Sequence, residues 1–134
     1  MKGSIYAIID VDTYEVYIGS TIQGIKTRYD KHMTDLRMHL GLAKRGRNYR
    51  KSFEILIKDF YKVVCVHDFD NLSDLEDLKF FETLYMIKFK HQGLKVINTC
   101  IANKRARSVN WRNFGLKELD LSTKPLFDSK PLLI

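Results

Sequence analysis

The sequence predicts an α+β fold in which helices pack against a small, mostly antiparallel sheet. Two runs rich in Ile, Val and Tyr, at 5–10 and 15–19, are separated by a turn-forming Asp12-Thr13 pair, which predicts a hairpin. A third strand-like run follows at 61–67, and 95–98 forms a short extended piece. Apolar residues at helical spacing fill the stretches between these runs.

Three helices are expected from this spacing. The first runs from about 24 to 43, and its apolar residues recur at intervals of three and four: Ile25, Tyr29, Met33, Leu36 and Leu40. Ser52 is expected to cap a short helix through about residue 60, with Phe53, Leu56, Ile57 and Phe60 as its apolar residues. Ser73 is expected to cap a long helix to about residue 90, because Glu76 completes a capping box.

Composition points to one ordinary globular domain of 134 residues, with 45% hydrophobic and 29% charged residues. No apolar run approaches the roughly 18 residues that a membrane helix needs, and the N-terminus lacks a signal-peptide pattern. We therefore expect an intracellular protein that is not secreted and has no membrane partner. Cys65 and Cys100 lie far apart in the sequence, which predicts buried thiols in a reducing compartment.

The net charge of +7 favours a polyanionic partner. One basic cluster contains Lys44, Arg45, Arg47, Arg50 and Lys51, and a second contains Lys104, Arg105, Arg107 and Arg112. Each cluster alone is equally compatible with a solvated loop. Nearby aromatic residues favour nucleic acid, since aromatic rings can stack on bases beside phosphate-binding cations. The segment 103–134 is interpreted as a basic C-terminal arm, in part disordered.

The hairpin register places two tyrosines together. A two-residue loop at Asp12 and Thr13 sets Ile8 opposite Tyr17, so Tyr6 and Tyr17 project from the same face of the sheet. The ordinary alternative is a pair of half-buried strand tyrosines. Gly19 ends the second strand, where a missing Cβ permits a bend or the close approach of another backbone.

The first long helix carries a polar stripe of Arg28, His32, Asp35 and His39, which fall within roughly 60° of one another. This stripe is either the margin of an amphipathic helix, with an Asp35–His39 pair, or one wall of a phosphate-processing cleft. Arginine offers a planar fork of donors to phosphate oxygens, and histidine transfers protons near neutral pH.

The third helix has a carboxylate on its apolar face. Glu82 lies in the middle of a stripe formed by Leu75, Leu78, Tyr85, Met86 and Phe89. A buried carboxylate must be paired, protonated or bound to a metal. A salt bridge, with Arg28 as one possible partner, is the structural alternative. Phe80, Leu84 and Ile87 form a second apolar strip, which is expected to pack under the arm or against a second subunit, so the oligomeric state stays open.

These residues resemble the GIY-YIG nuclease family over about residues 3–102. Several motifs follow one another at suitable spacing, which makes the resemblance specific. They are Ser4-Ile5-Tyr6, with Ser where the family name has Gly, then Tyr17-Ile18-Gly19 followed by Ser20-Thr21, Arg28, His32, Glu82 and Asn98. The resemblance implies a catalytic domain at 1–102 with a central three-stranded antiparallel sheet flanked by helices. The segment Ser52-Phe53-Glu54-Ile55-Leu56, followed by a strand, resembles the small stand-alone members common in large DNA viruses and phages.

The resemblance also implies an endodeoxyribonuclease that hydrolyses phosphodiester bonds in DNA with one divalent ion. Glu82 would hold Mg²⁺, with Mn²⁺ as a substitute, because a single carboxylate suits a cation that keeps several waters. No other small-molecule cofactor is expected. Catalytic roles fall to Tyr6, Tyr17, Arg28, His32 and Glu82, with Gly19 and Asn98 orienting the site and either Tyr6 or His32 as the general base. His39 and the basic residues Lys44, Arg45, Arg47, Arg50, Lys51, Lys104, Arg105 and Arg107 would contact nucleic acid. A catalytically inactive DNA- or RNA-binding protein is the alternative.

Overall fold

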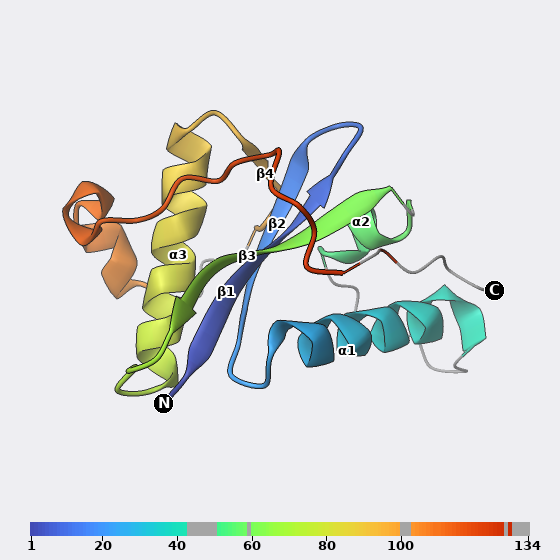
Figure 1. Cartoon of the computed structure of the whole chain (residues 1–134), viewed down its shortest axis with the longest axis horizontal. Helices are drawn as coiled ribbons and strands as arrows, with labels where there is room; N and C mark the ends of the chain where they lie inside the picture. The colour runs from blue at the N-terminus through green and yellow to red at the C-terminus, as the bar shows by residue number, and fades with distance from the viewer. Residues whose placement is uncertain (43–50, 59, 100–102, 128, 130–134) are drawn as a thin grey trace.

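The computed structural model describes residues 1–42, 51–58, 60–99, 103–127 and 129 (Figure 1). Helices cover both faces of one sheet, which confirms the predicted α+β class. The main elements are β1 (Gly3–Asp10), β2 (Glu15–Thr21), α1 (Ile25–Arg37), α2 (Phe53–Leu56), β3 (Tyr61–Phe69), α3 (Leu75–His91) and β4 (Lys95–Val96). Within these described ranges, no helix is both long enough and apolar enough to cross a membrane.

The sheet has four strands in the order β3-β1-β2-β4. β1 pairs antiparallel with both β2 and β3, as the predicted three-stranded sheet requires. The fourth strand, β4, pairs parallel with β2 through only two residue pairs, Glu15 with Lys95 and Val16 with Val96. The extended piece predicted at 95–98 thus contributes a fourth strand, which the predicted three-stranded sheet did not include.

The hairpin turn is longer than predicted, yet its register is the predicted one. The turn spans 11–14, and the Tyr14 N–H donates to the Asp10 carbonyl oxygen at 2.9 Å. The Asp10 carboxylate fixes the turn by accepting from the backbone N–H groups of Asp12 and Thr13. Because the turn gains one residue on each side, Ile8 still lies opposite Tyr17.

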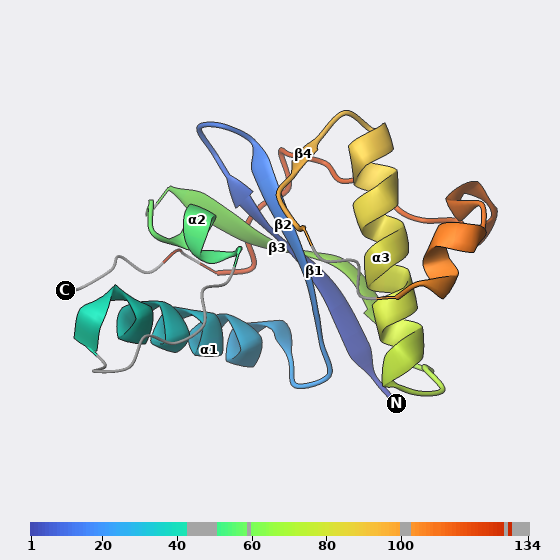
Figure 2. The ribbon, with the colours of Figure 1, turned by 180° about the vertical axis from the view of Figure 1, so that it is seen from behind.

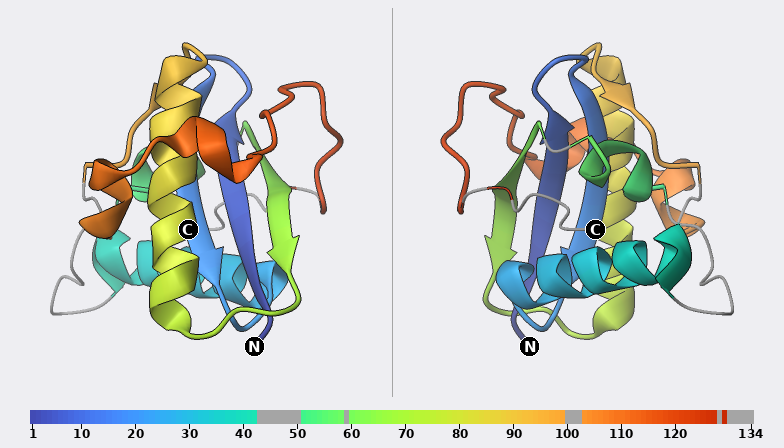
Figure 3. Two further views of the ribbon diagram at one scale, coloured as in Figure 1. Left: turned by 90° about the vertical axis from the view of Figure 1, so that its left-hand side faces the viewer. Right: turned by 90° about the vertical axis from the view of Figure 1, so that its right-hand side faces the viewer.

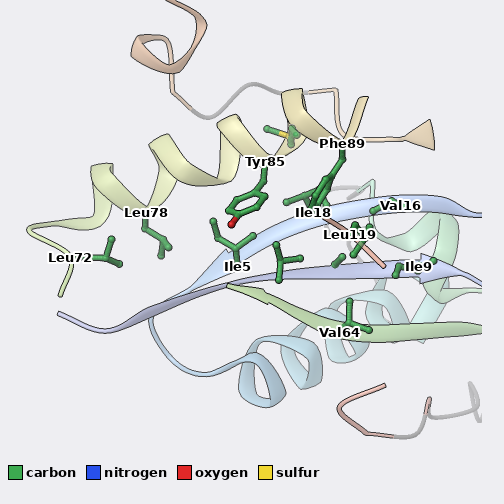
Figure 4. Close-up of a cluster of buried hydrophobic side chains, with 13 residues drawn as sticks. Ile5, Ile9, Val16, Ile18, Val64, Leu72, Leu78, Tyr85, Phe89 and Leu119 are labelled. Atoms are coloured by element: carbon green, nitrogen blue, oxygen red, sulfur yellow. The ribbon is translucent and has the colours of Figure 1, made fainter. Parts of the chain in front are cut away.

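Side-chain alternation along the strands divides the interior into two cores, one on each face of the sheet. Figure 3 shows α3 and α1 on opposite sides of the strands. On the α3 side, Ile5 and Ile18 pack against Leu78, Tyr85 and Phe89 of the helix (Figure 4). On the α1 side lie Tyr6, Ile8, Tyr29, Met33, Leu36, Phe53 and Ile55. The two tyrosines of the hairpin therefore face α1.

The first helix is shorter than predicted. α1 ends at Arg37, and Met38–Leu42 continue as a wider π-helical turn in which Gly41 adopts a φ of 110°. The change of direction leaves Leu40 40% exposed, so its predicted place on the apolar face is wrong. Glycine permits this left-handed conformation at little cost, which explains why the helical period fails here.

The second helix also stops early. α2 has one turn, and the predicted apolar positions Ile57 and Phe60 are 45% and 64% exposed. Ser52 is the N-cap residue of this turn, as predicted, but its side chain makes no capping hydrogen bond. The Ser52 hydroxyl instead lies 2.9 Å from Nδ1 of His32. A tertiary contact has replaced the local bond that serine normally makes at a helix start.

The third helix begins one residue later than its predicted cap. Asp74, not Ser73, is the N-cap, and its carboxylate accepts from the Asp77 N–H at 2.9 Å. Serine and aspartate cap helices about equally well, so adjacent candidates cannot be ranked from sequence. Leu75 then lies at the exposed end of the helix, with 46% of its surface accessible, and does not join the predicted apolar stripe.

The segment after residue 103 packs along the domain, and its described part is not a loose arm. Its first turns (Arg105–Ser108 and Trp111–Phe114) cover Phe80 and Leu84 of α3, with Ala106 fully buried, so the second apolar strip packs under the arm. The chain then crosses toward α1, as Figure 1 shows in red. Its Leu126 N–H donates to the Val63 carbonyl oxygen of β3 at 2.9 Å.

We predict that Leu78→Ala lowers the free energy of unfolding by about 2–5 kcal/mol, because Leu78 is fully buried between α3 and the sheet. Leu75→Ala, the matched control on the same helix, should change it by less than about 0.5 kcal/mol. Urea unfolding followed by circular dichroism measures both. Equal losses in the two variants would contradict this placement of the helix face.

Candidate active site

The hydroxyl of Tyr6 is the centre of the candidate site. Tyr6 is 2% exposed, and its hydroxyl lies 2.9 Å from Nε2 of His32. Burial raises the pKa of the Tyr6 phenol far above its ordinary value, and the neighbouring Tyr17 and Glu82 add to this rise, whereas the adjacent Arg28 guanidinium lowers it. Side chains from β1, β2, α1 and α3 thus act on one oxygen atom.

Gly19 makes this arrangement possible. It pairs directly with Tyr6 across the two strands, and the Tyr6 ring lies over its Cα. A Cβ at position 19 would lie 2.3 Å from both the Cζ and the hydroxyl oxygen of Tyr6, closer than real contacts allow. The predicted close approach at Gly19 is present, but the approaching group is a side chain and not a backbone.

His32 lies in the interior of the site. It is 0% exposed, and its two ring nitrogens face the hydroxyls of Tyr6 and Ser52, each at 2.9 Å. The ring of Tyr17 approaches it edge-on, with 5.9 Å between the ring centroids. The imidazole is therefore shielded from solvent and is hydrogen-bonded to the hydroxyls of Tyr6 and Ser52.

Glu82 lies at the edge of β2 with weak charge compensation. It is 8% exposed, and Nζ of Lys79 lies 4.0 Å from its carboxylate. Lys79 also donates to the Ser20 hydroxyl at 3.4 Å, which ties α3 to β2 beside Gly19. Across the described residues, Lys79 and not Arg28 is the ion-pair partner of Glu82. Lys79 was not predicted, although its spacing of three residues from Glu82 was visible in the sequence.

Asn98 holds the backbone of β2 between Tyr17 and Gly19. Its side-chain oxygen accepts from the Ile18 N–H at 2.9 Å, and its side-chain nitrogen donates to the Ile18 carbonyl oxygen at 2.8 Å. The amide thus continues, at Ile18, the pairing that β4 makes with Glu15 and Val16 of β2. Both backbone groups of Ile18 are satisfied by one side chain, so Asn98 fixes the strand that carries Tyr17 and Gly19.

An open hollow lies at the end of the sheet where α1 begins. Its volume is about 280 Å³, and it is lined by Lys2, Gly3, Ser4, Thr21, Ile22 and Gly24. Ser4 and Thr21 pair with each other two positions along the strands from the Tyr6–Gly19 pair, and neither Tyr6 nor Gly19 lines the hollow. In Figure 2 this end of β2 runs down to the start of α1.

A divalent cation would have one protein carboxylate here. Among the residues that the structure describes, no three His, Cys, Asp or Glu side chains gather into a potential metal site. Glu82 is mostly buried and only weakly paired, so it retains the capacity to bind a cation. One carboxylate supplemented by water and phosphate oxygens is a common environment for Mg²⁺, so the residues present fit this ion.

The predicted nucleic-acid contacts are dispersed. Lys44, Arg45, Arg47 and Arg50 lie outside the described residues. His39 lies against the Phe53 ring, and Lys51 pairs with Glu54 at 2.8 Å. Lys104 and Arg107 are exposed, while Arg105 lies over the Phe80 ring and 3.6 Å from Asp77, on the side of α3 that faces the arm.

The thiol of Cys65, the cysteine that the structure describes, is hydrogen-bonded to none of the described residues of the candidate site. Cys65 is a free, half-buried thiol, and burial raises its pKa to about 11, so it is protonated at neutral pH. Cys100 lies outside the described residues. A protonated thiol is a poor nucleophile and a poor metal ligand, and the candidate chemistry therefore belongs to the oxygen and nitrogen groups around Tyr6.

No protein-family model, curated protein or solved structure matches the chain. The site is therefore described by its own geometry. It combines a half-buried guanidinium, a buried carboxylate and two phenols, one of them hydrogen-bonded to a buried imidazole. Such groups can bind a phosphate and a cation, and can move a proton between a phenol and an imidazole.

We predict that Gly19→Ala destabilises the protein by about 1–3 kcal/mol, because the new Cβ overlaps the Tyr6 ring. The backbone of Gly19 is not left-handed, so alanine has no conformational penalty of its own there. In a Tyr6→Ala background, the same substitution should cost much less, which a double-mutant cycle of urea unfolding measures. Equal costs in both backgrounds would show that the ring does not lie over residue 19.

Proposed function

We propose that this protein is a divalent-metal-dependent endonuclease of the GIY-YIG type that hydrolyses phosphodiester bonds in DNA. The observation that carries the proposal is the contact of His32 with the Tyr6 hydroxyl, with Tyr17 packed against the same imidazole and with Arg28 and Glu82 close enough to shift the pKa of Tyr6. These are the residues that match the family motifs in order along the sequence. The net charge of +7 supports a polyanionic substrate.

Glu82 would hold the metal ion. Its carboxylate is 8% exposed, and its nearest cation in the described part of the chain is Lys79 at 4.0 Å, which leaves most of its charge available. Mg²⁺ or Mn²⁺ bound there would supply positive charge to the scissile phosphate and to the leaving oxygen. The charge of Glu82 raises the pKa of the Tyr6 phenol, although burial is the main cause of that rise.

Arg28 would neutralise the phosphate. It is half-buried one turn into α1, beside the Tyr6 hydroxyl, where a guanidinium can donate to non-bridging oxygens. Negative charge develops on those oxygens in the transition state of hydrolysis. A guanidinium that is already in place stabilises this charge without having to move. Tyr17, half-exposed and packed edge-on against His32, would bind the water or a phosphate oxygen.

Tyr6 and His32 would act together as the base. A raised pKa keeps the Tyr6 phenol protonated at neutral pH, so Tyr6 can accept a proton only while it passes its own to another group. Nε2 of His32 is hydrogen-bonded to that hydroxyl at 2.9 Å. His32 is itself too buried to contact the attacking water. The water proton would therefore move to Tyr6 as the Tyr6 proton moves to His32.

We predict that Glu82→Gln abolishes Mg²⁺-dependent nicking of a supercoiled plasmid while DNA binding persists, because the amide cannot replace the carboxylate as a cation ligand. Glu76→Gln is the matched control, since Glu76 lies on the same helix and its carboxylate is hydrogen-bonded only to Asn103 in the described structure. Nicking is followed on agarose gels and binding by fluorescence anisotropy.

Cleavage in excess EDTA, or full activity of Glu82→Gln, would remove the metal assignment. Binding without any cleavage by the wild-type protein, across duplex, nicked, branched and single-stranded DNA and RNA, would favour the catalytically inactive binding protein instead.

We predict that Tyr6→Phe lowers kcat by about 10²–10⁴-fold, the usual contribution of a positioned general base. His32→Gln should also lower kcat, and its residual rate should rise with pH, because the Tyr6 proton must then leave to solvent. Tyr14→Phe, at an exposed turn position, is the control and should cleave normally. A His32→Gln variant with wild-type rate and pH profile would exclude the transfer from Tyr6 to His32.

A further inference from the structure

A line of three hydrogen-bonded side chains runs through the candidate site. The Ser52 hydroxyl meets Nδ1 of His32, and Nε2 of His32 meets the Tyr6 hydroxyl, each at 2.9 Å. Ser52 and His32 are 0% exposed and Tyr6 is 2% exposed, so water does not compete for these bonds. The line connects the start of α2 to β1 through α1.

We propose that Ser52 is a positioning residue that keeps the His32 proton on Nδ1, so that Nε2 is free to accept the proton of Tyr6. This inference rests on the proposed function and adds a residue to it. Ser52 is 20 residues from His32 in the sequence, and sequence patterns placed it in a helix cap and in the segment 52–56 but indicated no role for it in the site.

The direction of the hydrogen bonds follows from the donors around Tyr6. Arginine can only donate, so Arg28 uses a lone pair of the Tyr6 oxygen, and the hydroxyl keeps its own proton to donate. Among the described residues, the only other hydrogen-bond partner of that hydroxyl is Nε2 of His32, so a buried phenol proton that needs an acceptor goes to Nε2. A neutral imidazole that accepts at Nε2 carries its proton at Nδ1, and Nδ1 then donates to Ser52.

The backbone around Ser52 supports this role. Its carbonyl oxygen accepts from the N–H groups of Ile55 and Leu56 at 3.2 and 3.0 Å, which anchors the residue at the start of α2. Its hydroxyl makes no capping bond, although serine at this position commonly gives its oxygen to a helix N–H. The helix start thus forgoes a local bond, and the hydroxyl is held against His32 instead.

The test combines two hydroxyl variants with one control. Ser52→Ala removes the acceptor for Nδ1, Ser52→Thr keeps a hydroxyl, and Thr34→Ala removes an exposed hydroxyl from α1 that bonds only to the Asp30 carbonyl oxygen in the described structure. Two-dimensional ¹H–¹⁵N NMR of the imidazoles reports which nitrogen of His32 is protonated. Plasmid nicking with Mg²⁺ gives kcat, KM and the pH profile.

The wild-type protein and Ser52→Thr should show His32 protonated on Nδ1. Ser52→Ala should show a mixture of the two tautomers, with kcat about tenfold lower, the effect of one hydrogen bond, and KM unchanged. Its pH profile should move, since the imidazole loses the partner that stabilises its charged form. Thr34→Ala should match the wild type in every measurement.

Protonation of wild-type His32 on Nε2 would overturn the inference without any variant, even if Ser52→Ala fails to fold. Wild-type tautomer, kcat and pH profile in folded Ser52→Ala would overturn it as well, while leaving the proposed nuclease intact. Absence of cleavage by the wild-type protein would instead overturn the proposed function, and the NMR result would still decide whether Ser52 fixes the tautomer.

Discussion

The contact between the Tyr6 ring and Gly19 is the constraint on which the candidate site depends. The ring crosses from β1 onto β2 because position 19 has no side chain. Its hydroxyl is thereby brought to His32 and Arg28 on one side and within electrostatic reach of Glu82 on the other. Any larger residue at 19 would push the hydroxyl away from all of these groups together.

The edge of β2 that faces away from β1 is the second feature that organises the site. β4 covers only its first two residues, the Asn98 amide pairs with Ile18 next, and Lys79 of α3 reaches Ser20 beyond that. Three different segments therefore hold this edge of β2, one after another along the strand. This order fixes β2 firmly on both sides of Gly19 and leaves the Glu82 carboxylate close to the end of the strand.

The same arrangement places two charged side chains at the margins of otherwise apolar cores. α3 and α1 pack on opposite faces of the sheet, and each contributes a charged side chain that is buried or half-buried at its margin, Glu82 and Arg28. The segment after 103 joins these layers from outside, covering Phe80 and Leu84 and reaching Tyr29 with the Phe127 ring. The walls of the site are thus tied together by a segment whose sequence resembles a loose tail.

Short-range patterns determined the α+β class, the hairpin register and the two tyrosines on one face, because alternation and helical spacing act between near neighbours. The same patterns identified Glu82 as a candidate site residue, because it is an acid on an apolar helix face. Tertiary structure alone decided that Ser52 bonds to His32 and not to its own helix, and that Arg28 approaches the Tyr6 hydroxyl and does not pair with Glu82. These outcomes depend on which elements pack together in the fold. The residues next to a side chain in the sequence do not specify a partner that belongs to another element.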